Sequence, residues 1–139
     1  MRRSVLLAAT CGGLALAAGC GDSEPTGEVA GQVQVDDAPA PAGTYITFTP
    51  ADGSKSPQGA EVKEGKYRLR LAAGPAKVAV HAPKQTGTRK LYPTADSPVT
   101  PTFVESLPAK YNDKTELSHN VATGEQSKDW DLKSKFAKK

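Results

Sequence analysis

Apolar and polar side chains alternate with a period of two along most of the chain, the pattern of β-strands that bury one face. The clearest segment is 66–71, where Tyr67, Leu69 and Leu71 alternate with three cationic residues. The apolar side chains are predicted to face a core and the cations, Arg68 among them, to face solvent. Similar patterns predict six further strands, around residues 28–35, 44–49, 58–63, 78–80, 117–121 and 130–132.

Turn signals separate these strands, and no segment has the pattern of an amphipathic helix. Glu64-Gly65 predicts a tight turn that pairs segment 58–63 with segment 66–71. Trp130 is expected in the core because it alternates with two aspartates. Seven short strands with turns between them predict an all-β sandwich. The remaining turn signals lie at 51–53, 73–75 and 123–125.

Residues 83–103 contain four prolines and lack the clear alternation of the other segments, so we expect a long loop without regular structure. The loop contains cationic and aromatic side chains that are suited to an interaction surface: Arg89, Lys90, Tyr92 and Phe103. The alternative is a variable excursion without a function of its own. Both interpretations stay open at this point.

The N-terminal segment predicts export. Two arginines precede an apolar run over 5–18, which is too short for the roughly 20 residues of a membrane span. The residues Leu16-Ala17-Ala18-Gly19-Cys20 resemble the end of a bacterial lipoprotein signal peptide. That resemblance implies cleavage after residue 19 and acyl chains, such as palmitate, on Cys20. An ordinary signal peptide that is cleaved nearby is the alternative.

The resulting organisation is a signal peptide (1–19), a lipidated cysteine with a short tether (20–27), one domain (28–133) and a basic tail (134–139). Cys11 would leave with the signal peptide, so Cys20 would have no disulfide partner. The expected location is the extracytoplasmic cell envelope, with the membrane bound through the lipid. Whether the membrane is the inner or the outer one stays open.

Charge and chemistry exclude several classes of function. Without Arg2 and Arg3, 16 of the 18 Lys and Arg remain against 15 Asp and Glu, a net charge of +1 that gives no reason to expect nucleic acid as a partner. His81 is predicted to point outward and His119 inward, with no spacing typical of a metal site. Asp129 and Asp131 are expected on a solvated face. We therefore predict no cofactor, no metal and no enzymatic activity.

The order of several motifs resembles a known family. The segments 31–39, 46–50, 65–69 and 73–78 resemble a carboxypeptidase regulatory-like (transthyretin-like) domain, and Leu107-Pro108-Ala109-Lys110-Tyr111-Asn112-Asp113 resembles a segment of small planctomycete lipoproteins. One departure is Asp37-Ala38-Pro39, where that family usually has Asp-Gly-x-Pro.

This resemblance implies a seven-stranded, prealbumin-like (Ig-like) β-sandwich on a lipid-anchored surface protein without established chemistry. The related fold also hosts a hydrolase with a C-terminal Tyr-Arg-Gly-Ser motif, which this chain lacks. We expect a non-enzymatic accessory or interaction module for an envelope protein or glycan. The alternative is a periplasmic or surface binding protein for a glycan or a small ligand. The oligomeric state stays open.

Overall fold

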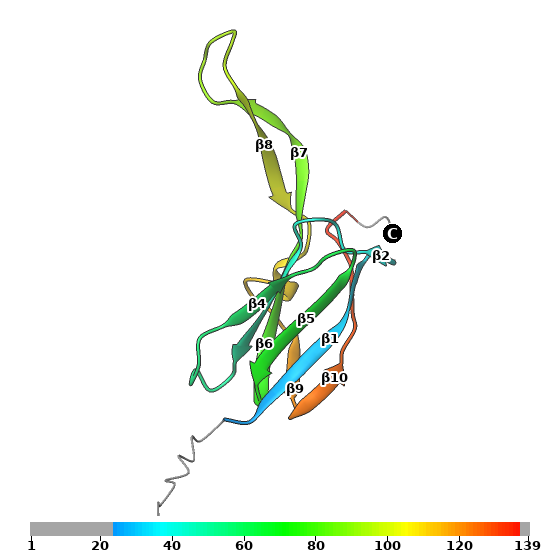
Figure 1. Ribbon diagram of the computed structural model, residues 1–139. Coiled ribbons are helices and arrows are strands. Elements are labelled where there is room, and N and C mark those ends of the chain that lie inside the picture. Colours follow the sequence, from blue (N-terminus) through cyan, green and yellow to red (C-terminus); the bar gives the residue numbers. More distant parts are fainter. Residues whose placement is uncertain (1–23, 137–139) are drawn as a thin grey trace, which may run out of the picture.

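The computed structural model describes residues 24–136, so the predicted signal peptide, Cys20 and residues 137–139 of the basic tail lie outside the described residues. The described chain is all-β, with strand segments and one short 3₁₀ helix (Figure 1). The elements are β1 (Thr26–Val35), β2 (Ala38–Pro39), β3 (Tyr45–Pro50), β4 (Gln58–Glu61), β5 (Lys66–Ala72), β6 (Gly74–His81), β7 (Pro83–Lys90), β8 (Val99–Glu105), η1 (Ala109–Tyr111), β9 (Ser118–Val121), β10 (Gly124–Ser127) and β11 (Trp130–Leu132).

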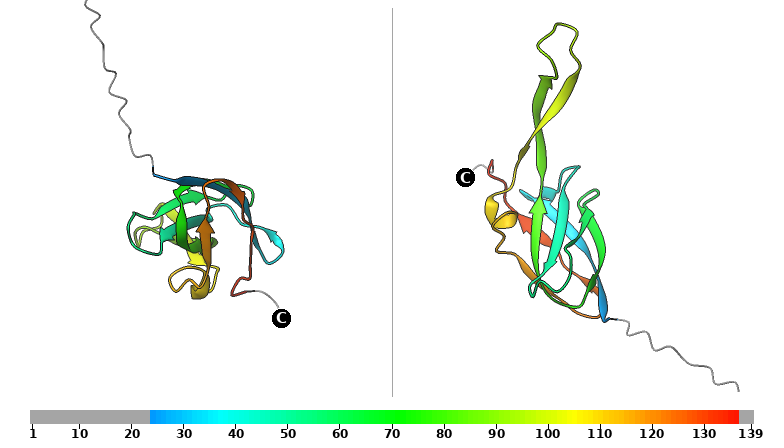
Figure 2. Two further views of the ribbon diagram at one scale, coloured as in Figure 1. Left: turned by 90° about the horizontal axis from the view of Figure 1, so that it is seen from below. Right: turned by 90° about the vertical axis from the view of Figure 1, so that its left-hand side faces the viewer.

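Two sheets form a sandwich-like arrangement (Figures 1 and 2). The first is built around β1, with β5 and β2 antiparallel to it on one side and β10 and β11 parallel to it on the other. The second sheet has the order β4-β3-β6-β9. The expected seven strands correspond to β1, β3, β4, β5, β6, β9 and β11, whereas β2, β7, β8 and β10 were not predicted.

Alternation along each strand builds the core, as the sequence predicts. In β5, Tyr67 and Leu71 are buried and Leu69 is half-buried, while Arg68 is exposed. Trp130 is buried in β11. Burying such apolar surface is the main force that holds the two sheets together. The most deeply buried side chains, all under 2% exposed, are Phe48, Ile46, Leu107, Leu132, Val29, Val33, Val62, Val78, Val80 and Thr44.

The predicted turn at Glu64-Gly65 forms, but the predicted hairpin does not. Both turn residues have positive φ, 51° and 74°, and the amides and carbonyls of Lys63 and Lys66 exchange hydrogen bonds across the turn. Beyond that pair the strands separate, because β4 pairs with β3 while β5 pairs with β1. The turn is therefore a corner at which the chain passes from one sheet to the other.

The parallel pairing of β1 with β10 and β11 depends on small residues in β1. A Cβ atom on Gly31 would lie 1.9 Å from the carbonyl oxygen of Lys128, and one on Gly27 would lie 2.0 Å from that of Ala122. Only glycine permits so close a backbone approach. The prediction of a turn at 123–125 is only partly right, because Gly124 and Glu125 are the first residues of β10, which occupies this edge.

The prediction of an irregular loop over residues 83–103 is wrong. This segment forms β7 and β8, an antiparallel hairpin that continues the chain beyond β6. The prolines fit because none is required to donate a hydrogen bond within the ladder: Pro83 begins β7, and Pro93 lies in the tip that joins the strands. Pro101 faces Thr88 at a position where no bond between the two strands is needed.

The C-terminal segment is held at the same end of the sandwich as this hairpin (Figures 1 and 2). The Lys135 amide donates to the Ser106 carbonyl at 2.8 Å, and the Ser134 amide and hydroxyl both donate to the Asp36 carboxylate. These bonds from Ser134 hold the pKa of Asp36 below its usual range. The basic tail is therefore held to the sandwich at Ser134 and Lys135.

No helix in the described part of the chain is long and apolar enough to cross a membrane.

Candidate functional site: the projecting hairpin

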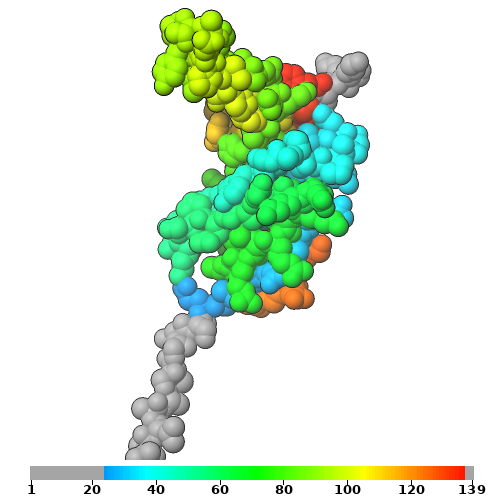
Figure 3. Space-filling view, turned by 45° about the horizontal axis from the view of Figure 1, so that its top comes forward, coloured from blue at the N-terminus to red at the C-terminus, as the bar shows by residue number. Residues whose placement is uncertain are grey.

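The most conspicuous feature of the surface is the β7–β8 hairpin, here called the arm (residues 83–105). It projects from one end of the sandwich, and β1 begins at the opposite end (Figures 1 and 2). In the space-filling view the arm forms a separate lobe beyond the body of the molecule (Figure 3). It forms a two-stranded sheet of its own among the described residues.

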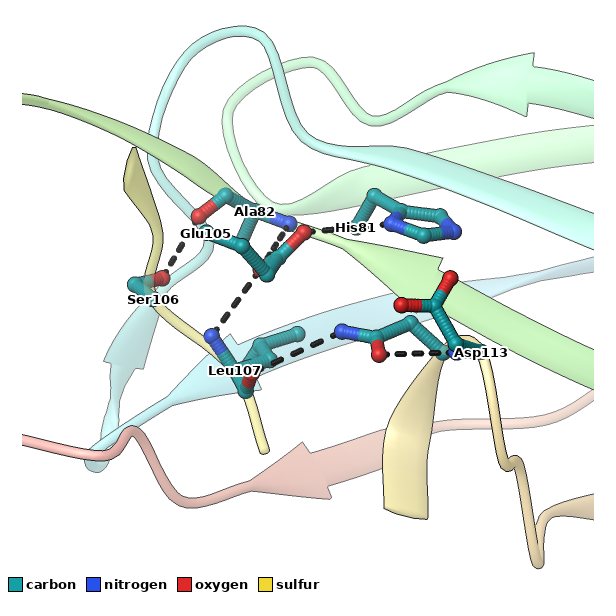
Figure 4. Close-up of polar contacts among 7 residues, drawn as sticks. His81, Ala82, Glu105, Ser106, Leu107 and Asp113 are labelled. Carbon is teal, nitrogen blue, oxygen red and sulfur yellow. Dashed lines mark hydrogen bonds and ion pairs between the residues drawn. The ribbon is translucent and has the colours of Figure 1, made fainter. Parts of the chain in front are cut away.

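One carboxylate joins the arm to the sandwich (Figure 4). The Oε1 atom of Glu105 accepts hydrogen bonds from the backbone amides of Ala82 at 3.0 Å and Leu107 at 2.9 Å. Its Oε2 atom lies 3.1 Å from Nδ1 of His81. Beside it, the Ser106 hydroxyl donates to the Ala82 carbonyl at 2.6 Å. These hydrogen bonds thus hold the two strands of the arm together where they leave the core.

The register of the ladder assigns side chains to the two faces of the arm, because directly opposed residues share a face. A bulge at Thr86 shifts the register on β7. One face carries Val99, Pro101 and Phe103 opposite Lys90, Thr88 and Gln85, and the other carries Thr100, Thr102 and Val104 opposite Arg89, Gly87 and Lys84.

Large apolar side chains are exposed mainly on this arm. Of the seven exposed large apolar residues among those described, five belong to it. Tyr92 and Val99 are each 63% exposed and Phe103 is 57% exposed, although the sandwich has a core that accommodates residues of the same types. A concentration of exposed apolar residues on one element is typical of an interaction surface. The five are Leu91, Tyr92, Val99, Phe103 and Val104.

The arm is also cationic. Over residues 83–105 it has Lys84, Arg89 and Lys90 against two carboxylates, Asp96 in the tip and Glu105, which is bonded at the base. The ammonium group of Lys90 donates to the carbonyls of Thr94 and Ala95, both at 3.2 Å, and so organises the tip.

The four predicted interaction residues all lie on the arm, but they do not converge on one site. Arg89 lies on the opposite face of the ribbon from Phe103, and Tyr92 lies in the tip. Lys90 shares a face with Phe103 but is at the other end of the ladder. The prediction missed Glu105 and the exposed Leu91, Val99 and Val104. The alternation of Val99 and Phe103 with threonines was the signal for β8, which the prolines obscured.

The remaining candidates for chemistry, His119, Asp129 and Asp131, lie apart from the arm in β9, before β11 and in β11. His119 is half-buried, and its Nε2 atom lies 3.1 Å from Oε1 of Gln126, as expected for a packed histidine. Asp129 accepts a hydrogen bond from the Gln32 amide at 2.8 Å, and Asp131 is exposed. Among residues 24–136 no group of three or more His, Cys, Asp or Glu side chains is arranged to hold a metal ion.

A cavity of 410 Å³ opens at the other end of the sandwich, where β1 begins. Its apolar floor includes Phe48, Leu71 and Val121, and its rim includes Arg70. An ion pair between Lys55 and Glu24 lies at the same opening.

Comparison of the chain with known protein families, curated proteins and solved structures finds no match.

Proposed function

We propose that the protein is a lipid-anchored, non-enzymatic module of the cell envelope that presents the arm to a binding partner. The observation that carries this proposal is the concentration of exposed apolar and cationic side chains on one projecting hairpin. An isolated two-stranded hairpin is only marginally stable in water. Here Glu105 and its partners stabilise the base of the arm while its sides stay uncovered.

The described chain begins at the end of the sandwich opposite the arm (Figure 1). Three residues lie between Cys20 and Glu24, and the four residue-to-residue steps span at most about 14 Å when the chain is fully extended. A lipid on Cys20 would thus keep the start of β1 close to the membrane, and the arm would point away from that membrane. We infer that the partner is an envelope protein or glycan on the distal side.

We also assign the sandwich to the prealbumin-like (Ig-like) class. The support is the order of sequence motifs over residues 28–133 together with the sandwich-like arrangement of the two sheets.

Site-specific photocross-linking tests the role of the arm. A benzophenone amino acid replaces Tyr92 or Phe103 in cells of the native host, and Tyr45, which is 45% exposed outside the arm, serves as the matched control. We expect a discrete adduct from both arm positions and none from the control. Adduct patterns that are the same at all three positions would contradict the proposal.

The cavity beside Glu24 favours a second candidate function, the binding of a small amphipathic anion. Its 410 Å³ falls within the range of about 300–1,000 Å³ that is typical of ligand pockets. Arg70 at the opening would pair with the anionic group, since the Lys55 ammonium is already engaged by Glu24. Titration with carboxylates of four to ten carbons, followed by the amide NMR signals of Ala72 and Ala73, tests this function. Unchanged signals across the series would exclude it.

A further inference from the structure

The two edges of the arm differ in their ability to pair with another strand. The Leu91 amide donates to the Pro98 carbonyl at 3.0 Å, so these two residues face each other at a hydrogen-bonded position. Hydrogen-bonded and non-hydrogen-bonded pairs alternate along an antiparallel ladder, so Thr88 and Pro101, three pairs further on, have backbone polar groups that point away from the partner strand. On β8 the outward edge therefore lacks a donor at Pro101, because proline has no N–H group. Proline on an edge strand is a common protection against further pairing.

The outward edge of β7, in contrast, has backbone donors and acceptors that β8 does not use. The N–H and C=O groups of Thr88 point outward, and so do those of Lys90, which is two residues further along the strand. In the described residues β7 pairs with β8 and with no other strand. No proline interrupts β7 after Pro83. One edge of the arm is thus blocked and the other is available.

Charge determines which strand fits the open edge. Lys84, Arg89 and Lys90 give this short strand three positive charges and no carboxylate. Two copies of β7 side by side would bring these cations together, and like charges on neighbouring strands are destabilising. An acidic strand would instead neutralise them, and such a difference is the basis of specificity.

We propose that the open edge of β7 binds an extended acidic segment of a partner protein as a third strand of the arm. The inference rests on the proposed function, since it names the partner and the mode of binding. Side chains of the added strand alternate between the faces. Acidic residues would lie beside Lys84 and Arg89, and β-branched or apolar residues would extend the face of Val99 and Phe103.

Capture from the edge itself is the first part of the test. A benzophenone amino acid at Gln85, on β7, is photolysed in cells of the native host, and mass spectrometry identifies the attached segment. We expect a protein segment in which acidic residues alternate with apolar or β-branched ones. A glycan, a lipid or a basic segment at this position would overturn the proposal. If the Tyr92 and Phe103 positions still form discrete adducts, the proposed function stands.

The second part of the test removes the outward N–H group of Thr88. Thr88→Pro removes an N–H that the hairpin does not use, while the matched control Thr88→Val keeps it. Capture from Gln85 should fall about tenfold in T88P, the effect of about 1.4 kcal/mol of lost hydrogen bonding, and should be retained in T88V. Equal capture by the two folded variants would overturn strand addition.

A synthetic peptide of the captured segment gives a test that does not require T88P to fold. We expect it to bind the wild-type protein and to shift the amide NMR signals of Thr88 and Lys90. N-methylation of alternate residues in one register should abolish binding, and N-methylation in the other register should preserve it. If neither N-methylated peptide loses binding, side chains alone hold the segment, and the proposal is overturned.

Discussion

The Oε2 atom of Glu105 lies 3.1 Å from Nδ1 of His81, at the point where the chain leaves the sandwich to form the arm. The other oxygen of the same carboxylate accepts hydrogen bonds from the backbone amides of Ala82 and Leu107, both of which are residues of the buried core. One acidic side chain thus provides the acceptors for donors on both sides of the junction. This carboxylate therefore contributes, together with the bonds of Ser106 to Ala82, to holding the arm on the sandwich.

Two replacements of Glu105 should separate the hydrogen bonds to the two amides from the effect of the negative charge. Glu105→Ala leaves the amides of Ala82 and Leu107 without an acceptor, and we expect the free energy of unfolding to fall by about 1.5–3 kcal/mol. Glu105→Gln keeps an oxygen for both amides and should lose less than about 1 kcal/mol. Urea denaturation measures both values. Faster hydrogen exchange at Ala82 and Leu107 in E105A alone would locate the effect, and equal losses in the two variants would contradict it.

Tyr67 predicts a dependence on alkaline pH. Its hydroxyl donates to the Lys128 carbonyl at 2.7 Å and accepts a bond from Nε1 of Trp130 at 3.1 Å. Burial raises the pKa of Tyr67 to about 12, from 10.0 in the unfolded chain. The neutral hydroxyl therefore contributes stability that is fully present below pH 10 and is lost as the pH rises towards 12.

Between pH 10 and about 12, the unfolding free energy of the wild-type protein should fall more steeply than that of Tyr67→Phe. The difference in slope should be about 1.4 kcal/mol per pH unit. The variant is the control because lysines titrate in the same range in both proteins. Denaturation at pH 9, 10 and 11 measures the difference. Parallel pH profiles for the two proteins would show that Tyr67 ionises equally in the folded and unfolded states.

Gly31 should tolerate no side chain. In Gly31→Ala the new Cβ atom would meet the Lys128 carbonyl at 1.9 Å, which forces β1 away from its parallel neighbours. We expect a loss of about 3 kcal/mol, the upper range for overpacking. Gly87→Ala is the matched control, because its Cβ atom would lie 3.6 Å from the Thr102 hydroxyl. A thermal unfolding midpoint lowered equally in both variants would contradict this account.

Cys20 should determine where the protein resides in the cell. Cys20→Ala removes the sulfur that the lipid would occupy, so we expect the protein to leave the membrane fraction. Two or more acyl chains anchor a protein stably in a membrane. Cys11→Ala is the control and should stay with the membrane. Retention of C20A in the membrane fraction would exclude the lipid anchor.

Local patterns predicted the strands that form the two sheets. The alternation around Tyr67 places this residue and Leu71 in the core and Arg68 in solvent, as the structure shows. The Glu64-Gly65 turn was predicted for the same reason, since a tight turn needs positive φ at adjacent residues. Such features depend on neighbours within a few residues, and these are visible in the sequence.

Pairing between distant segments was not predictable in this way. The β4–β5 hairpin was expected because its turn is local, but Val62 donates to the Thr44 carbonyl at 2.8 Å and Val33 donates to that of Gly65 at 2.7 Å. These long-range bonds draw the two strands into different sheets. The parallel edge of β1 is equally non-local, because it joins Gly27 to Gly124 and Val33 to Trp130.

The sequence alone determined the alternation within the seven predicted strands, core residues such as Tyr67, Leu71 and Trp130, and the chemistry of residues 83–103. The tertiary structure decided that these last residues form a hairpin that projects from the sandwich. The physical reason is that prolines are compatible with a strand when the ladder needs no donor from them, as at Pro101. The role of Glu105 also depends on tertiary structure, because a carboxylate becomes a structural joint only where folding brings buried amides to it.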